Sequence, residues 1–203
     1  MELIIITVLI VASVVGLTFI IERGLALRVS KVVPSQIESA LETCRSEGDL
    51  PMFRRICEQH PSPLGRLLLF VDNHRSWEKS ETISALETRA RHEISKLERG
   101  LVVLEIVVGV APLLGLVGTI YGLITLFAGM GEAGPGSNGD LAKGIAIALN
   151  ATLLGLLTAI PSLIAWSYYN KKVETFAVEM AAICEEFLRR QYQKSDVPSE
   201  VSK

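Results

Sequence analysis

The chain has 203 residues, 49% of them apolar, and a formal net charge of −2. This charge gives no indication of nucleic-acid binding. The charged residues fall in blocks between long uncharged segments, which is typical of a membrane protein with soluble parts. The three cysteines (Cys44, Cys57 and Cys184) lie far apart without a CxxC pair, so we expect reduced structural thiols rather than a disulfide or metal site.

Three segments are long and apolar enough to cross a bilayer, which takes about 20 residues. They are residues 3–21, residues 101–128 with Glu105 near the start, and residues 141–169 with Lys143 at one edge. Because basic residues follow the first segment rather than precede it, we expect a retained helix and not a signal peptide. The predicted fold is an all-α membrane protein with three transmembrane helices.

The basic residues predict the orientation of the chain. All of the 20 Lys and Arg residues except Lys143 follow helix one, precede helix two or follow helix three. Since basic flanks stay in the cytoplasm, we expect the N-terminus outside and the C-terminus inside. The expected parts are a first transmembrane helix (1–22), a cytoplasmic helical region (23–99), a second transmembrane helix (100–128), a short periplasmic loop (129–140), a third transmembrane helix (141–169), and a cytoplasmic helix with a disordered tail (170–203).

Helices two and three are expected to extend into the cytoplasm. Prolines divide residues 22–99 into short helices, with starts predicted after Pro34 and within HPSPLGRLLLFV at residues 60–71. From residue 80 the apolar residues recur at three- and four-residue intervals, which predicts one helix of roughly 70 Å from about residue 80 to 128. A similar apolar stripe continues beyond Tyr169 to Phe187.

The sequence contains no pattern typical of an enzyme. There is no nucleophile paired with a base, no glycine-rich phosphate loop and no metal-ligand spacing, so we expect no catalytic residue, cofactor or metal. The three histidines are isolated in the charged soluble region and are interpreted as surface residues.

Small residues follow one face of helices two and three, although glycine is a poor helix former in water. In lipid, helices associate through close packing, which small residues permit. These faces pack either within one subunit, or between subunits or onto a guest helix. The predicted packing residues are Gly115, Gly118, Gly122, Ala148, Gly155 and Ala159.

Two threonines share that face. Counted from the middle of each span at about 1.5 Å per residue, Thr119 and Thr152 lie at the same depth, roughly 5–7 Å outside the midplane. The two hydroxyls either form one polar spot or each bond the carbonyl four residues earlier. Asn150 is a further polar group that needs a partner within or between subunits. Pro112 and Pro161 are expected to bend the two helices.

No Asp, Glu, His or Lys lies in the middle of any span. Glu105 is near the cytoplasmic end of helix two, about 15 Å from Thr119 by helical rise. A chain that moves protons is expected to carry a titratable group at mid-depth. If this chain moves protons, that group must come from another protein.

Two motifs resemble the MotA/TolQ/ExbB proton channel family, and in particular its ExbB and TolQ members. They are AP-x-x-G-x-x-GT-x-x-G from Ala111 and G-I-A-x-A-L-x-A-T-x-x-G-L-x-x-A-I-P from Gly144, within a similarity that covers roughly residues 64–175. The resemblance implies a bacterial inner-membrane protein that forms a pentamer around a largely apolar pore. Thr119 and Thr152 match the two pore threonines of the family.

The resemblance also implies partners. A single-span protein of the ExbD/TolR type would stand inside the pore and supply a transmembrane aspartate, and a TonB/TolA-like protein would receive the work. ExbB and TolQ commonly carry a glutamate five residues before the second threonine, and this chain has Ile147 there. We therefore expect the partner aspartate to be the sole titrating group, with Asn150 as a local compensation for the missing glutamate.

The leading hypothesis is a motor subunit that uses the proton motive force to drive work across the cell envelope. A Na⁺-driven motor of the same family and a passive oligomeric scaffold are the alternatives.

Overall fold

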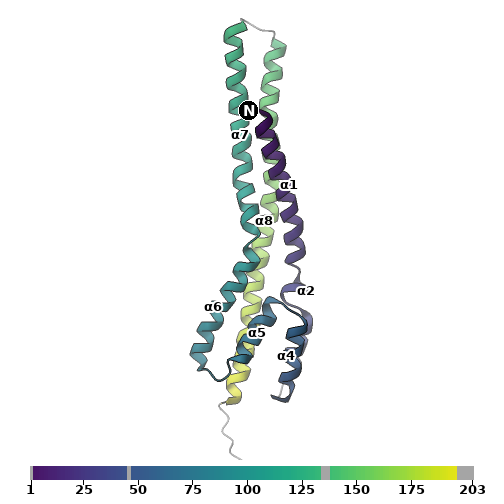
Figure 1. Cartoon of the computed structure of the whole chain (residues 1–203), viewed down its shortest axis with the longest axis vertical. Coiled ribbons are helices and arrows are strands. Elements are labelled where there is room, and N and C mark those ends of the chain that lie inside the picture. The colour runs from purple at the N-terminus through teal and green to yellow at the C-terminus, as the bar shows by residue number, and fades with distance from the viewer. Residues whose placement is uncertain (1, 45–46, 134–137, 196–203) are drawn as a thin grey trace, which may run out of the picture. The chain divides into compact units, whose positions relative to one another are not determined.

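The computed structural model describes residues 2–44, 47–133 and 138–195, and every regular element in them is helical (Figure 1). Three of these helices are long and apolar enough to cross a membrane, over Ile4–Ala26, Leu101–Ala128 and Gly144–Tyr192. The predicted all-α fold with three such helices is therefore confirmed, whereas its orientation in the membrane stays a prediction. The elements are α1 (Glu2–Ala26), α2 (Val29–Val32), α3 (Ser35–Thr43), the 3₁₀ turn η1 (Glu47–Asp49), α4 (Leu50–Gln59), α5 (Pro63–Asn73), α6 (Lys79–Glu98), α7 (Leu101–Ala133) and α8 (Asn138–Ser195).

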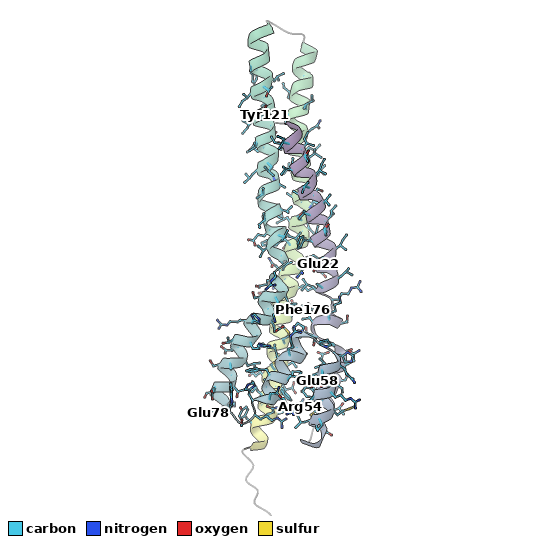
Figure 2. The ribbon with its side chains drawn as sticks, viewed as in Figure 1. Glu22, Arg54, Glu58, Glu78, Tyr121 and Phe176 are labelled. Carbon is cyan, nitrogen blue, oxygen red and sulfur yellow. The ribbon has the colours of Figure 1, made fainter. Side chains whose placement is uncertain are left out.

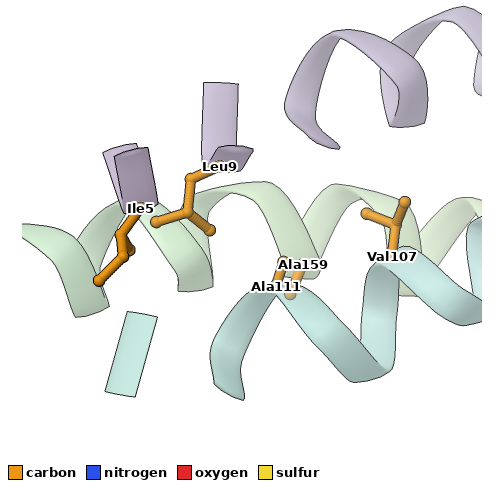
Figure 3. Packing of buried hydrophobic residues seen from close by; sticks show 5 residues of the cluster. All are labelled: Ile5, Leu9, Val107, Ala111 and Ala159. Atoms are coloured by element: carbon orange, nitrogen blue, oxygen red, sulfur yellow. The ribbon is translucent and has the colours of Figure 1, made fainter. Parts of the chain in front are cut away.

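The chain forms two compact units, of which the first comprises Met1–Gly24 and Arg99–Asn170. It consists of α1, α7 and the first part of α8. Its buried apolar cluster takes side chains from all three helices, and Figure 3 shows them close together: Ile5, Leu9, Val107, Ala111 and Ala159. Helix α1 is therefore packed against both of the other spans.

Polar contacts also join α1 to α8 in this unit. The Tyr169 hydroxyl donates a hydrogen bond of 2.9 Å to the Ile20 carbonyl. Gly16 lies against Ser162, because a Cβ at Gly16 would be 3.0 Å from the Ser162 hydroxyl oxygen. A side chain at position 16 would require the Ser162 hydroxyl to move.

The second unit comprises Leu25–Glu98 and Lys171–Lys203. Helix α5 begins where the sequence predicts, since the Ser62 hydroxyl accepts a hydrogen bond of 3.0 Å from the Gly65 amide and Pro63 occupies the first turn. The core of this unit contains Phe53 of α4, which lies 5.3 Å from the Phe187 ring of α8 between ring centres. Other buried core side chains are Leu64, Leu67, Leu68, Val71, Phe176 and Met180.

Two buried carboxylates connect the short helices of this unit. Asp72 of α5 binds Arg54 of α4, a side chain labelled in Figure 2, and lies 2.8 Å from a guanidinium nitrogen of Arg75. Glu93 of α6 accepts hydrogen bonds of 2.9 Å from Arg66 of α5 and from Lys96. Both acids are fully covered and both have cationic partners, as buried charges require.

These surroundings change the acidity of two buried groups. Burial by itself would raise the pKa of Glu93, but the hydrogen bonds and positive charges of Arg66 and Lys96 outweigh it and hold the pKa below its usual range. Burial, followed by the nearby negative charges of Asp72 and Glu58, raises the pKa of the Cys57 thiol to about 12. Cys57 is therefore a protonated core residue at neutral pH.

The structure corrects the predicted continuous helix from about residue 80 to 128. Helix α6 ends at Glu98 and α7 begins at Leu101, with a turn at Arg99 and Gly100. Glycine weakens a helix, and the Arg23 side chain occupies the position that a Cβ at Gly100 would need. By contrast, α8 continues without a break to Ser195, as its apolar stripe predicts.

Candidate functional site

Helices α7 and α8 lie so close along the predicted small-residue face that glycines of one helix face backbone atoms of the other. A Cβ at Gly155 would lie 2.6 Å from the Ala111 carbonyl oxygen, and a Cβ at Gly115 would lie 2.9 Å from the Ala151 carbonyl oxygen. A Cβ at Gly118 would lie 2.6 Å from the Ala151 Cβ. A side chain at Gly155 or Gly115 would collide with backbone atoms of the facing helix, and one at Gly118 would collide with the Ala151 Cβ.

All six predicted packing residues are buried within the single chain: Gly115, Gly118, Gly122, Ala148, Gly155 and Ala159. For Gly115, Gly118 and Gly155 the neighbouring atoms belong to a facing helix of the same chain, whereas a role of this face in packing between subunits stays a prediction. The sequence reading missed Ala151, a buried alanine that faces both Gly115 and Gly118. Ala151 was not predicted because the stripe of small residues was assigned to Thr152, the next residue in the sequence.

The two predicted threonines meet across this contact. The Thr119 hydroxyl of α7 lies within hydrogen-bonding reach of the Thr152 hydroxyl of α8. Thr152 donates across to the Gly115 carbonyl at 3.0 Å. Thr119 lies 3.2 Å from the Ala148 carbonyl oxygen of α8 and 3.3 Å from the Gly115 carbonyl oxygen of its own helix. The result is one cluster of two hydroxyls and two carbonyl oxygens.

Other hydroxyls of the membrane helices behave differently. Thr18, Thr125, Thr158 and Ser162 each donate to the carbonyl four residues earlier in their own helix. This is the usual solution for a hydroxyl in an apolar helix. Thr152 instead uses a carbonyl of the neighbouring helix, so its hydroxyl is placed by the contact between helices.

Both hydroxyl protons of the cluster are donated to acceptors within the cluster. Two hydroxyls carry two donatable protons, and the acceptors around them are two carbonyl oxygens and the hydroxyl oxygens themselves. If Thr152 donates to the Gly115 carbonyl, the acceptors within reach of the Thr119 proton are the Ala148 carbonyl, the Gly115 carbonyl of its own helix and the Thr152 oxygen. Lone pairs on the hydroxyl oxygens remain available. In this arrangement the pair can accept a hydrogen bond from a protonated group, whereas donating one requires a hydroxyl to leave its carbonyl.

The remaining predicted residues lie apart from the pair. Asn150 is exposed on the surface of the single chain, so it does not join the hydroxyl cluster, and Ile147 is exposed on the same side of α8. Pro112 and Pro161 lie inside α7 and α8, and both helices continue through them. A bend at the prolines and a role for Asn150 stay predictions.

The surroundings of the hydroxyl pair are neutral. Glu105 is exposed on α7, ten positions before Gly115 in the sequence. In the part of the chain that the structure describes, no three His, Cys, Asp or Glu side chains lie close enough together to hold a metal ion. The cluster is thus a set of uncharged oxygen atoms at a contact of two membrane helices.

Comparison with known proteins agrees with this architecture. Residues 52–182, which include both threonines, match the MotA/TolQ/ExbB proton channel family. The Tol-Pal system protein TolQ of Pseudomonas aeruginosa is 30% identical over 209 residues, covering 93% of this chain and 87% of that protein.

Two ExbB relatives give the same result. An ExbB-like biopolymer transport protein of Synechocystis is 32% identical over 182 residues, covering 83% of this chain and 69% of that protein. The biopolymer transport protein ExbB of Aquifex aeolicus is 33% identical over 105 residues, covering 52% of this chain and 70% of that protein. The family is one of channels and transport proteins rather than of enzymes. Since the family match covers more than half of the sequence, the chain belongs to the MotA/TolQ/ExbB proton channel family.

Proposed function

We propose that the chain is the channel-forming motor subunit of a bacterial inner-membrane complex that uses the proton motive force to drive work across the cell envelope. The observation that carries this proposal is the hydroxyl pair of Thr119 and Thr152, in which Thr152 donates to a carbonyl of the neighbouring helix and the two hydroxyls lie within hydrogen-bonding reach of each other. A neutral pair with free lone pairs is suited to receive a proton carrier and release it again.

The proton carrier itself must come from another chain. No Asp, Glu, His or Lys lies in the middle of any span of this sequence. A single-span partner of the ExbD/TolR type, with a transmembrane aspartate, would supply the carboxyl group. When that carboxyl is protonated it can donate to the hydroxyl pair. When it is ionised, the pair must turn a hydroxyl away from a carbonyl to bind it.

This difference couples protonation to geometry. A hydroxyl that turns from the Gly115 carbonyl toward a carboxylate removes one hydrogen bond between α7 and α8. Each proton that crosses the membrane releases about 2.3 kcal/mol per 100 mV. Several protons are enough to drive a conformational step of a few kcal/mol, which a TonB/TolA-like protein would transmit.

The proposed assembly is a homo-oligomer, with a pentamer as the expected form, around the partner helices. The outward faces of α7 and α8 within one chain are strongly apolar, with exposed side chains such as Leu113, Ile120, Leu153 and Ile160. Lipid or neighbouring copies would cover these faces.

Proton flux in liposomes tests the proposal. The chain is reconstituted with its aspartate-bearing partner, and flux is followed with a pH-sensitive dye under an imposed potential. We expect Thr152→Val to lower flux about tenfold or more, because it removes a hydroxyl that is bonded across the helices. Thr119→Val should have a smaller effect, since Thr152 keeps its bond to Gly115. A normal flux in both variants would overturn the pore role.

A matched control and two conditions separate the alternatives. Thr158→Val makes the same chemical change in α8 at a hydroxyl that bonds Leu154 of its own helix, so flux should be unchanged. Activity that follows external Na⁺ and survives a protonophore would indicate a Na⁺-driven motor. Flux that persists when the partner aspartate is changed to asparagine would exclude the proposed carrier, and no flux in any combination would favour a passive scaffold.

A further inference from the structure

A groove of about 490 Å³ lies in the second unit, away from the hydroxyl pair. It is formed where the chain leaves α1 and passes the start of α5. Its lining residues are Ala26, Ser30, Lys31, Val32, Pro34, Gln59, His60, Pro61, Pro63, Arg66 and Leu97. None of these lining residues is acidic.

The charge of this groove is positive. Lys31 and Arg66 both line it, and His60 adds an imidazole that carries an N–H donor in either tautomer. Arg66 is bound to Glu93, but Lys96 shares the same carboxylate, so the three side chains together keep one net positive charge. When Lys31 is added, the net charge of the groove and of the two residues that bind Arg66 or share its carboxylate, Glu93 and Lys96, is +2.

Several polar groups of the groove are not engaged elsewhere. Within residues 2–44, 47–133 and 138–195, the side chains of Ser30, Lys31, Gln59 and His60 make no hydrogen bond or ion pair. Lys31 and Ser30 are also exposed. A hydroxyl, an ammonium, an amide and an imidazole are thus available to a ligand that accepts hydrogen bonds and carries negative charge.

The groove begins at the end of a membrane span. Ala26 is the last residue of the first apolar helix, Ile4–Ala26, and it lines the groove. Ser30 and Lys31 follow four and five positions after Ala26 in the sequence. Apolar side chains line the rest, including Val32, Pro63 and Leu97. A ligand with a phosphate at the membrane surface and an apolar body fits this combination better than a free anion does.

We propose that this groove binds the headgroup of an acidic phospholipid. The lipid phosphate would lie between Lys31 and Arg66, the donors of Ser30 and His60 would complete its hydrogen bonds, and the glycerol and upper acyl chains would follow the apolar lining toward Ala26. Basic pockets at the ends of membrane helices bind acidic headgroups in this way. The lipid would hold the second unit to the membrane surface whether or not the chain conducts protons.

Lipid retention by the full chain tests this proposal. The purified chain is placed in nanodiscs of equal phosphatidylglycerol and phosphatidylcholine, and bound lipids are counted by native mass spectrometry after release into detergent. We expect retention of phosphatidylglycerol over phosphatidylcholine. Lys31→Gln should lower that retention about fivefold, which corresponds to the usual contribution of one lysine at an acidic membrane surface.

Lys171→Gln is the matched control. Lys171 is also an exposed lysine beside the end of a predicted span, but it lies outside the groove and pairs with Glu174 on the surface. It should leave lipid retention unchanged. An equal loss in the two variants would mean general attraction to the membrane, and no loss in Lys31→Gln would mean that the groove holds no headgroup. Either outcome overturns the proposal.

Excess inorganic phosphate distinguishes a lipid from a soluble anion. Because the apolar lining contributes to holding a lipid, phosphate should not displace bound phosphatidylglycerol. Displacement by phosphate alone would assign the groove to a soluble phosphate ligand and overturn the lipid proposal. Circular dichroism of each variant shows whether the helical fold is intact, since Lys31 is exposed and its replacement should not change the core.

Discussion

Single residues decide how closely α7 and α8 approach. Gly155 and Gly115 face backbone atoms of the opposite helix, and this closeness brings the Thr152 hydroxyl within 3.0 Å of the Gly115 carbonyl oxygen. The same glycines that permit packing therefore place the candidate site. A residue with a side chain at either position would separate the hydroxyls as well as the helices.

Gly155→Ala is expected to destabilise the first unit by about 1–3 kcal/mol, the usual cost of overpacking. The new methyl group would lie 2.6 Å from the Ala111 carbonyl oxygen and 3.2 Å from the Gly115 Cα, and neither backbone atom can rotate away. Thermal unfolding of the chain in detergent, followed by circular dichroism, measures the effect.

Gly109→Ala makes the same change on α7 where a Cβ would meet no atom within 4 Å. It should be neutral or slightly stabilising, because alanine is the better helix former. If the two variants unfold at the same temperature, the close contact at Gly155 does not limit stability.

At the scale of helices, ion pairs join the short helices of the second unit, because apolar burial alone does not fix which helices lie next to each other. Helix α5 is joined to α4 through Asp72 and Arg54 and to α6 through Arg66 and Glu93. The sequence predicts α5 and α6 as separate helices, from a proline start and an apolar stripe. It contains no signal that Arg66 and Glu93, 27 positions apart, would meet.

Glu93→Gln should lower stability at neutral pH by about 2 kcal/mol, because it weakens charged hydrogen bonds from Arg66 and Lys96. The pKa of Glu93 is lowered in the folded chain, so its contribution is complete above the ordinary glutamate pKa of about 4.3 and is lost as the pH falls through the lowered value. The gap in unfolding temperature between the native chain and the variant should thus be widest at pH 7 and shrink below about pH 4.

Glu87→Gln supplies the comparison on the same helix. Glu87 is largely exposed and only 4.0 Å from Arg91, so its replacement should change stability by less than about 0.5 kcal/mol. A constant gap between Glu93→Gln and the native chain from pH 7 to pH 3 would contradict the assigned role of the Glu93 charge.

At the scale of the whole molecule, the third membrane helix carries an exposed amide. Asn150 is exposed on α8 among apolar neighbours such as Ile147 and Leu154. A carboxamide that faces hydrocarbon is unfavourable, so a neighbouring chain is its natural partner. This is consistent with a homo-oligomer as the working form.

Asn150→Leu is therefore expected to weaken the oligomer by about 1 kcal/mol per contact while the monomer stays folded. Native mass spectrometry over a range of protein concentrations would show smaller assemblies at the low end. Leu153→Ile, at another exposed position of α8, changes no polar group and should leave the distribution unchanged. An unaltered oligomer in Asn150→Leu would mean that the amide has no partner in a second copy.

Family membership is a property of the whole molecule, and two short sequence motifs indicate it. The two motifs that contain Gly115, Gly118 and Thr119 on one helix and Thr152 and Gly155 on the next carry the resemblance to the family, and their small residues permit close packing in lipid. The sequence likewise indicated the three apolar helices and most of the α8 stripe, because periodic burial is a local pattern.

What the sequence determined by itself is therefore the helical membrane class and the family, together with the prediction that Thr119 and Thr152 lie at one depth. What only the tertiary structure decided is which atoms those hydroxyls bond, that the helix predicted over 80–128 is interrupted between Glu98 and Leu101, and which side of α8 Asn150 occupies. Helix formation and apolar periodicity depend on neighbours a few positions away, so a sequence displays them directly. The bonds of Thr152 to Gly115 and of Glu93 to Arg66 depend on how separate helices are turned toward each other, which the sum of many weak packing contacts sets.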